Sequence, residues 1–242
     1  MNQNERITTG IVLRTTNYKD NDKILTVFSV DEGKITVMLK SCRQLKSKLK
    51  FAGQPFCFAE WTLTQKGETC IAVNALEIES FFDITQNFDK LVYASALIEM
   101  CDYVLNPYEP TSALFVELLK SLKILAFHKC KPEIVFCKFS LKLLEIAGYK
   151  LETDKCKHCG RSFANKVVFD YNFGGFVCGL CPCSAGKEIS LGALKSLKII
   201  DNTEFDRLDS IQINVNFLKE IIAVLKENFT FRFGRKIKSL NI

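Results

Sequence analysis

Lys34-Ile35-Thr36-Val37-Met38-Leu39-Lys40 is the stretch that decides the fold of the N-terminal third of this chain. Ile35, Val37 and Leu39 alternate with their neighbours, so they share one face of a strand. Similar runs of branched and aromatic residues lie on both sides, between turn signals such as Lys66-Gly67. These runs cover about residues 7–16, 23–30, 56–65 and 69–79. Five short strands in so short a segment predict a small closed barrel.

Among five-stranded barrels the OB-fold is the common one, and its open face and loops bind single-stranded nucleic acid. Four aromatic residues of the predicted strands could stack on bases there or fill the barrel: Phe28, Phe56, Phe58 and Trp61. Because large apolar side chains stabilise a fold mainly when buried, we expect most of them to fill the barrel.

The hydrophobic period changes after about residue 85. Apolar residues recur at spacings of three and four from Leu91 to Leu105 and from Leu114 to Leu125, which predicts two amphipathic helices. Pro132 fits the first turn of a third helix that stops near Gly148. Further on, Ser190 and Asn216 are expected to be the N-caps of helices over about 191–200 and 217–228.

Two C-x-x-C pairs lie between the predicted helices. They are formed by Cys156, Cys159, Cys178 and Cys181, and this spacing is typical of a structural, tetrahedral zinc site. A glycine in each knuckle is expected to let the backbone turn sharply. Lys155, Lys157 and Arg161 flank the first pair and are expected to offset the charge of four thiolates and to donate hydrogen bonds to sulfur.

Other interpretations of these cysteines are two disulfides, a redox dithiol, buried free thiols, or a site in which Cys183 replaces Cys181. The total of 11 cysteines is odd. The seven outside the pairs lie among apolar neighbours and are expected to be small core residues: Cys42, Cys57, Cys70, Cys101, Cys130, Cys137 and Cys183. The chain opens without an apolar run and has no long uncharged stretch, so we predict a cytoplasmic protein with no signal peptide and no membrane span.

These observations predict an α+β protein with four segments. Residues 1–80 form the barrel, residues 81–150 the first part of a helical domain, residues 151–187 an inserted zinc-binding module, and residues 188–242 the second helical part with a basic tail. The 242 residues and 48% hydrophobic content are sufficient for a sizeable core.

The net charge of +6 is unevenly distributed. Residues 1–50 carry ten Lys or Arg and five Asp or Glu, a local balance of +5, and half of these cations lie between Lys40 and Lys50. Such a segment is typical of a polyanion-binding loop, and a solvated lysine-rich turn is the alternative. We predict that these residues contact DNA: Arg14, Lys34, Lys40, Arg43, Lys46, Lys48, Lys50, Arg232, Arg235 and Lys236.

No catalytic site is predicted. The chain has neither a G-x-x-x-x-G-K-[ST] loop nor a G-x-G-x-x-G motif, and it contains only two histidines. His158 lies inside the first knuckle, where a surface or outer-shell role is expected, and His128 ends a predicted helix. Asp20 and Asp22 are expected to belong to a solvated hairpin loop, with a metal site as the alternative. We therefore predict that the protein is not an enzyme.

Several motifs together resemble the RecO family of bacterial recombination mediators. Gly10-Ile11-Val12-Leu13-Arg14, Ile24 to Ser29 and Gly33-Lys34 are similar to its opening signature, and Lys40, Arg43, Lys46 and Ser47 to its basic loop. Gly148-Tyr149, Gly174-Gly175 and the two C-x-x-C pairs are similar to its central part, and Gly234 to Ser239 to its end. Ser41 is a departure, since the family usually has glycine there.

The resemblance implies a protein that binds single- and double-stranded DNA, anneals complementary strands and, with RecR, helps to load RecA onto strands coated by single-stranded-DNA-binding protein. It implies one structural Zn2+ and a cytoplasmic, nucleoid-associated location. Two other classes remain open: an RNA-binding or transcription-associated protein with the same barrel and zinc ribbon, and an interaction scaffold that binds no nucleic acid.

Overall fold

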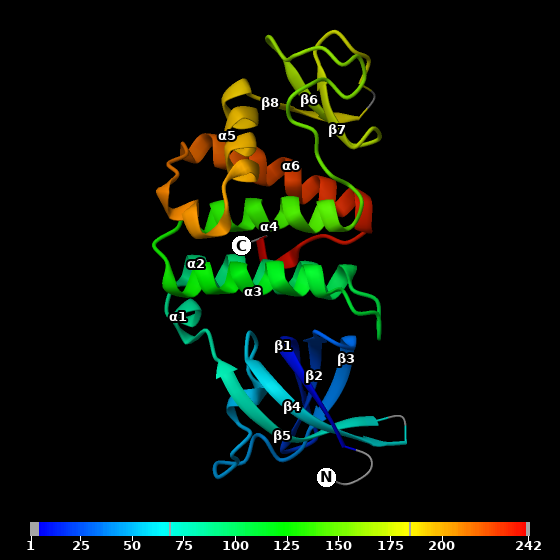
Figure 1. The fold of residues 1–242 in the computed structure, drawn as a ribbon, viewed down its shortest axis with the longest axis vertical. Helices are drawn as coiled ribbons and strands as arrows, with labels where there is room; N and C mark the ends of the chain where they lie inside the picture. Colours follow the sequence, from blue (N-terminus) through cyan, green and yellow to red (C-terminus); the bar gives the residue numbers. More distant parts are fainter. Residues whose placement is uncertain (1–4, 68, 184, 241–242) are drawn as a thin grey trace. The chain divides into compact units, whose positions relative to one another are not determined.

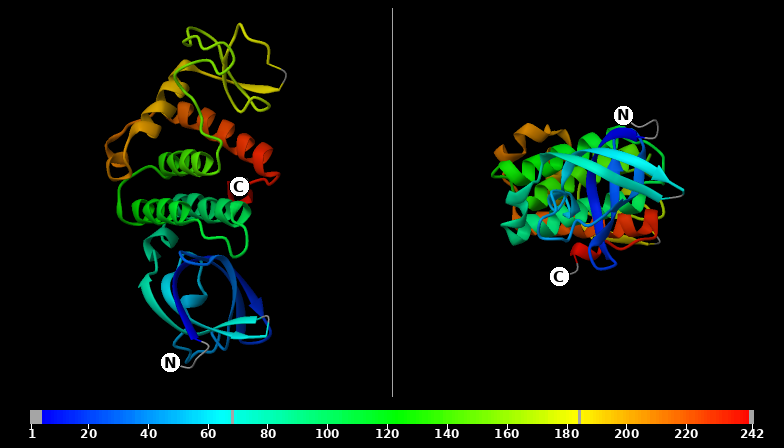
Figure 2. Two further views of the ribbon diagram at one scale, coloured as in Figure 1. Left: turned by 45° about the vertical axis from the view of Figure 1, so that its right-hand side comes forward. Right: turned by 90° about the horizontal axis from the view of Figure 1, so that it is seen from below.

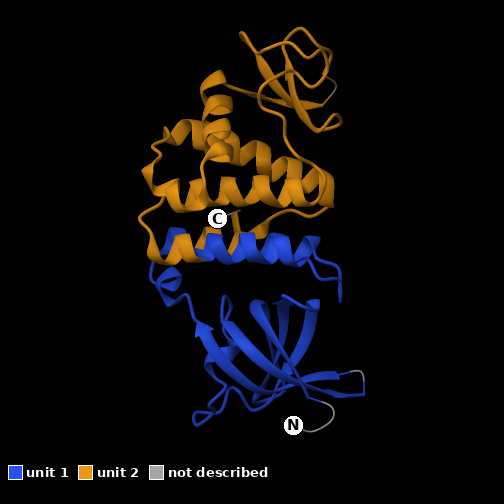
Figure 3. Ribbon diagram, in the orientation of Figure 1, with its two compact units in different colours: residues 1–91, 98–122 blue, residues 92–97, 123–242 orange. Residues whose placement is uncertain are grey.

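The computed structural model describes residues 5–67, 69–183 and 185–240 (Figure 1). The chain divides into two compact units (Figure 3), one formed by residues 1–91 and 98–122 and the other by residues 92–97 and 123–242. The barrel strands and the long helices follow the hydrophobic periodicity of the sequence. The fold is mixed α and β, with the barrel first and the helices after it, as predicted.

The first unit contains a closed barrel of five strands. They are β1 (Glu5–Tyr18), β2 (Asp22–Ser29), β3 (Gly33–Leu39), β4 (Phe58–Lys66) and β5 (Thr69–Glu79), in the order β1-β2-β3-β5-β4. The β3–β5 pair is parallel and short, with Val37 opposite Cys70, whereas the other pairs are antiparallel. This is the predicted OB-fold barrel.

The barrel interior is packed around Trp61, which is fully buried and donates from Nε1 to the carbonyl of Gly10 at 3.1 Å. Gly10 has no room for a side chain, since a Cβ there would lie 2.6 Å from Val27 Cγ1. Phe28 and Phe58 pack their rings against Phe115, with centroids 5.2 and 6.1 Å apart. All four candidate stacking aromatics of the barrel are buried, so they fill the fold and are not available to bases.

Helices account for most of the remaining chain. They are α1 (Phe82–Thr85), α2 (Phe88–Val104), α3 (Ser112–Phe127), α4 (Pro132–Ile146), α5 (Leu191–Asn202) and α6 (Val215–Phe233). Short 3₁₀ turns lie at Phe51–Gly53, Phe205–Ser210 and Lys238–Leu240. In the second unit α4, α5 and α6 pack together, as Figure 2 shows. None of the helices described combines the length and the apolar character needed to cross a membrane.

The helix ends confirm two predicted signals and correct a third. Pro132 opens α4, and Ser190 Oγ accepts the Ala193 N–H at 3.1 Å as the N-cap of α5. The prediction that Asn216 caps the last helix is wrong. Asn214 is the cap, because its Oδ1 accepts the backbone N–H of Asn216 at 2.8 Å, and α6 then continues to Phe233. Arg232 consequently belongs to a helix and not to a tail.

A small three-stranded sheet, not predicted from the sequence, follows the first cysteine pair and includes Cys178 of the second. It consists of β6 (Val167–Asp170), β7 (Gly175–Cys178) and β8 (Gly186–Ile189), in the order β7-β6-β8. Six of the seven other cysteines are buried, as expected, and burial raises the pKa of the Cys57 thiol, helped by the charge of Glu77, to about 12. Cys183 is exposed, so the expectation of a core role was wrong for this residue.

Candidate metal centre and nucleic-acid interface

Four sulfur atoms converge beside the small sheet. The Sγ atoms of Cys156, Cys159, Cys178 and Cys181 all lie within 4.8 Å of one another. Three of the distances between them are 3.7 Å (Cys156 to Cys181), 3.8 Å (Cys159 to Cys178) and 3.6 Å (Cys178 to Cys181). Zinc–thiolate bonds of ~2.3 Å in a tetrahedron place the sulfurs ~3.8 Å apart, whereas a disulfide needs ~2.05 Å. The arrangement therefore fits one metal ion and excludes disulfides among these residues.

The two knuckles reach this geometry in different ways. In the first, the Gly160 N–H donates to the Cys156 carbonyl at 2.8 Å, and Gly160 adopts φ +71°, as the predicted glycine role requires. In the second, Cys178 ends β7 and its carbonyl accepts the Cys181 N–H at 3.1 Å. Gly179 has no positive φ, which corrects the prediction; a Cβ there would lie 2.8 Å from Lys166 Cβ, so close packing explains this glycine.

The backbone stabilises negative charge on the first sulfur. Burial raises the pKa of Cys156, but N–H groups of Cys159, Cys178 and His158 outweigh it and lower the pKa to about 6. The Cys178 N–H, for example, lies 3.3 Å from Cys156 Sγ. By contrast, burial and the neighbouring sulfurs raise the pKa of Cys181 to about 12. A cation between the four sulfurs would relieve this mutual repulsion and allow all of them to ionise.

One of the flanking cations, Lys157, contributes differently from the prediction. The Lys157 ammonium donates to the carbonyl of Gly174 at 3.0 Å, so it braces the turn after β6, and the hydrogen bonds to sulfur come from the backbone. Cys183 is not a member of the four-sulfur group. Burial and a hydrogen bond to Asp170 raise the pKa of its thiol, which makes it a poorer metal ligand than Cys156.

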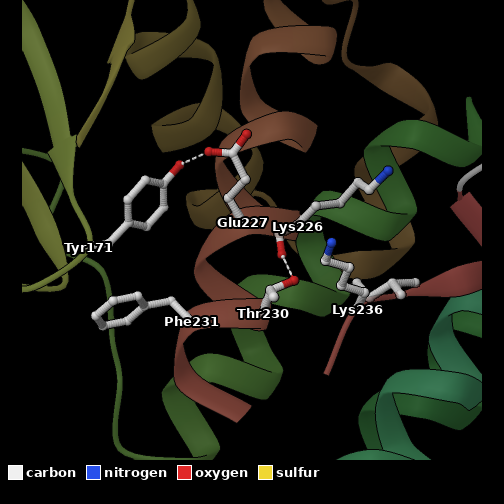
Figure 4. Close-up of a pocket in the computed structure, with 7 residues that line it drawn as sticks. Tyr171, Lys226, Glu227, Thr230, Phe231 and Lys236 are labelled. Carbon is white, nitrogen blue, oxygen red and sulfur yellow. Dashed lines mark hydrogen bonds between the residues drawn. The ribbon is translucent and has the colours of Figure 1, made fainter. Parts of the chain in front are cut away.

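The module joins α6 through a polar network beside a pocket of about 400 Å³ (Figure 4). The Glu227 carboxylate accepts hydrogen bonds from the Tyr171 hydroxyl and the Lys187 ammonium. Arg232 donates to the Tyr171 carbonyl at 3.0 Å, and its guanidinium lies 5.1 Å from the Tyr149 ring centroid. A Cβ on Gly174 would come within 1.8 Å of this guanidinium. Arg232, predicted to contact DNA, is thus part of this junction between the module and α6.

Glu227 makes the stability of this junction depend on pH. Burial raises the pKa of this carboxyl, but the hydrogen bonds from Lys187 and Tyr171 outweigh it, so the net shift is downward from 4.5. A lowered folded-state pKa stabilises the fold above about pH 4.5, and the stabilisation is lost as the pH falls through the folded value. We expect Glu227→Gln to flatten the acid limb of stability, measured as the denaturant midpoint between about pH 6 and 3. An unchanged acid limb would show that this carboxylate does not stabilise the junction.

The basic loop of the first unit is presented on a fixed backbone. Ser41 takes φ +53°, and its N–H donates to Asp22 Oδ1 at 2.7 Å. The Arg43 guanidinium donates to the Asp20 carbonyl at 3.0 Å. Asp20 lies exposed in the β1–β2 hairpin turn, as expected, whereas Asp22 begins β2 and holds the basic loop through its carboxylate. Five cations of the loop are exposed, and none has an ion pair with any described residue: Lys40, Arg43, Lys46, Lys48 and Lys50.

The other predicted DNA ligands differ in their exposure and in their partners within the protein. The Lys34 ammonium donates to the Asp102 carbonyl at 2.6 Å and lies 3.4 Å from its carboxylate, with only 20% of the side chain exposed. Arg14 lies 3.4 Å from the same carboxylate but is 64% exposed. Arg235 and Lys236 are exposed after α6. Sequence reasoning missed Asp102, because nothing local marks a helix residue as the partner of cations on two strands.

Comparison with known proteins adds a family assignment. The models for "Recombination protein O N terminal" and "Recombination protein O C terminal" match residues 1–82 and 85–241. The chain is 34% identical to the DNA repair protein RecO of Caldicellulosiruptor saccharolyticus over 91% of this chain and 89% of the relative. It is 32% identical to that of Caldicellulosiruptor bescii (97% and 96%) and 30% to that of Clostridium novyi (97% and 92%).

Proposed function

Because this chain belongs to the RecO family of DNA repair proteins, we propose that it is a non-enzymatic recombination mediator. In this proposal it binds single- and double-stranded DNA and anneals complementary strands in the cytoplasm, at the nucleoid. Its partners would be RecR and single-stranded-DNA-binding protein, and RecA would be reached indirectly through them. The observation that supports this proposal most is the exposed basic loop from Lys40 to Lys50, whose cations form no ion pair with a carboxylate of the described residues.

The chemistry of annealing supports this proposal. Two strands repel each other through their phosphates, so a surface that brings them together must neutralise both backbones and leave the base edges accessible. Lysines on a braced loop can do this without forming or breaking a covalent bond. Arg14 in the first unit and Arg235 and Lys236 in the second are further exposed cations that could contact phosphates, whereas Lys34 and Arg232 are held by intramolecular partners.

The metal has a structural role in the proposal. One Zn2+ would be bound by Cys156, Cys159, Cys178 and Cys181, since four thiolates fill a tetrahedral site and leave no position for a substrate. The ion would cross-link the two cysteine pairs and compensate the negative charge of the four thiolates. It would fix residues 151–187 as a module between the two helical parts, 81–150 and 188–242, with residues 1–80 as the DNA-binding barrel.

Strand annealing tests the function directly. We expect the protein to accelerate pairing of complementary single strands coated with single-stranded-DNA-binding protein, and RecR to change the rate or yield. The measurement is the gain of duplex signal from end-labelled strands, with naked strands as the control. Preference for RNA over DNA of equal length would favour the RNA-binding alternative. Absence of a salt-dependent affinity for either would favour the scaffold.

A further inference from the structure

The turn between β6 and β7 holds Phe173 in the solvent. Half of this residue is exposed (50%), although it is a large apolar side chain. Asp170 Oδ1 accepts the backbone N–H groups of Asn172 and Phe173 at 2.9 and 3.1 Å, and Gly174 closes the turn with φ +63°. The Gly174 N–H also donates to the Asp170 carbonyl at 2.7 Å. The exposure of Phe173 is therefore imposed by a well-braced turn.

A second ring lies next to it. His158, exposed in the first knuckle, has its ring centroid 5.3 Å from that of Phe173, with 47° between the planes. The two turns are fastened together by Lys157, whose N–H donates to the Phe176 carbonyl at 2.9 Å and whose ammonium donates to the Gly174 carbonyl at 3.0 Å. Two surface rings from distant sequence positions are thus fixed as a pair.

Two cations lie close to His158 in the sequence. Lys155 and Arg161 are exposed on either side of His158, and neither has an ion pair with a described residue. Other cations in or beside the module are neutralised, Lys150 by Glu145, Lys166 by Glu188 and Lys187 by Glu227. The Cys178 N–H donates to Cys156 Sγ, so this sulfur is bonded by the backbone, and Lys155 and Arg161 remain available for an external anion.

We infer that His158 and Phe173 form a stacking platform for a base of single-stranded nucleic acid, with Lys155 and Arg161 contacting the adjacent phosphates. Exposed aromatic faces beside cations are what such chains recognise. The exposed phenylalanines of the first unit differ in this respect. Phe82 and Phe88 are 63% and 66% exposed but are followed directly by Asp83 and Asp89, which repel phosphate. The inference rests on the proposed function and adds to it a second contact surface in the zinc module.

Substitution of Phe173 in the metal-loaded full chain tests the platform. We expect Phe173→Ala to weaken binding of a fluorescent oligothymidine roughly 5- to 150-fold, the range for loss of one stacked base. The slope of log affinity against log salt should not change, since no phosphate contact is removed. Phe173→Trp should restore affinity. Phe173→Leu should not, although it keeps apolar volume and protects the fold. Metal content and the thermal midpoint confirm that each variant is folded.

An abasic deoxyribose-phosphate oligomer of the same length separates stacking from charge. Wild type should lose affinity for it, whereas Phe173→Ala should bind it as wild type does, because the stacking partner is absent in both cases. Phe82→Ala is the matched control and should bind like wild type. Wild-type affinity of Phe173→Ala for oligothymidine would overturn the inference and leave the proposed function intact if the basic-loop lysines still matter. A wild-type protein without affinity for any single strand would overturn both.

Discussion

We expect a strong chelator to remove one zinc ion per chain and to unfold residues 151–187 while the barrel stays folded. Besides the metal, the module is held by its three short strands, by the buried rings of Phe169 and Phe176, whose centroids lie 5.0 Å apart, and by a small cluster at the sulfurs. That cluster consists of Val177 and the ligands Cys156 and Cys178, with partly buried Phe163, Val168 and Cys181 around it. Segments of ~40 residues rarely fold without a metal or disulfides, and zinc binding contributes ~10–16 kcal/mol in comparable small domains. The loss of structure should therefore be nearly complete within the module.

Two local probes distinguish the units. Trp61, the only tryptophan, is buried in the barrel, so its fluorescence should be unchanged by chelation. Trypsin should begin to cut at Lys157, inside the first knuckle, and at Arg161 and Lys166, between the two cysteine pairs. Elemental analysis of metal-replete protein should give a ratio near one, which Cys178→Ala abolishes and Cys183→Ala leaves unchanged. Full metal content in Cys178→Ala, or loss in Cys183→Ala, would refute the ligand assignment.

The contrast between the two glycines of this site illustrates the reach of sequence reasoning. The C-x-x-C spacing is local, so it identified four residues whose sulfurs indeed converge. The role of Gly160 could also be predicted from local sequence, because it depends only on the φ angle of that residue. Gly179 is explained by Lys166, thirteen positions earlier in the chain, through packing that no spacing rule encodes.

Element length determined which strands could be predicted. The barrel strands have at least seven residues, enough for alternation to be recognised, whereas β6, β7 and β8 have four each. The cap of α6 was misplaced because two asparagines, Asn214 and Asn216, are equally suitable by type, and only the hydrogen bond decides between them.

The least predictable property was which cations are held by partners within the protein. Lys34 and Lys40 are both lysines at the ends of one alternating stretch, yet Asp102 of α2 holds the first, while the second is exposed. Arg232 and Arg235 differ in the same way, because only Arg232 lies within reach of the Tyr171 carbonyl. Local sequence predicts where cations are concentrated, but the partners that remove a cation from a binding surface come from distant segments.

Replacing Lys40, Lys46 and Lys48 together by alanine should reduce the affinity for single-stranded DNA and lower the log-log salt slope by about 2, at ~0.7 for each phosphate that is no longer neutralised. These three lysines are chosen because they are exposed and their ammonium groups are not part of the loop's bracing, unlike the guanidinium of Arg43. The fold should therefore tolerate the triple substitution, with a change in stability below ~0.5 kcal/mol. Strand annealing should weaken in parallel.

The matched control removes the same charge elsewhere. Lys66, Lys123 and Lys219 are exposed but far apart in the sequence, and their joint replacement by alanine lowers the net charge equally. A general field effect would lower affinity similarly in both triple variants, whereas a localised contact lowers it much more in the loop variant, with the larger fall in slope. Equal slopes in the wild type and the loop variant would show that residues 40–50 are a solvated turn. The DNA contact would then have to be sought at Arg14, Arg235 and Lys236, the other predicted ligands that remain exposed.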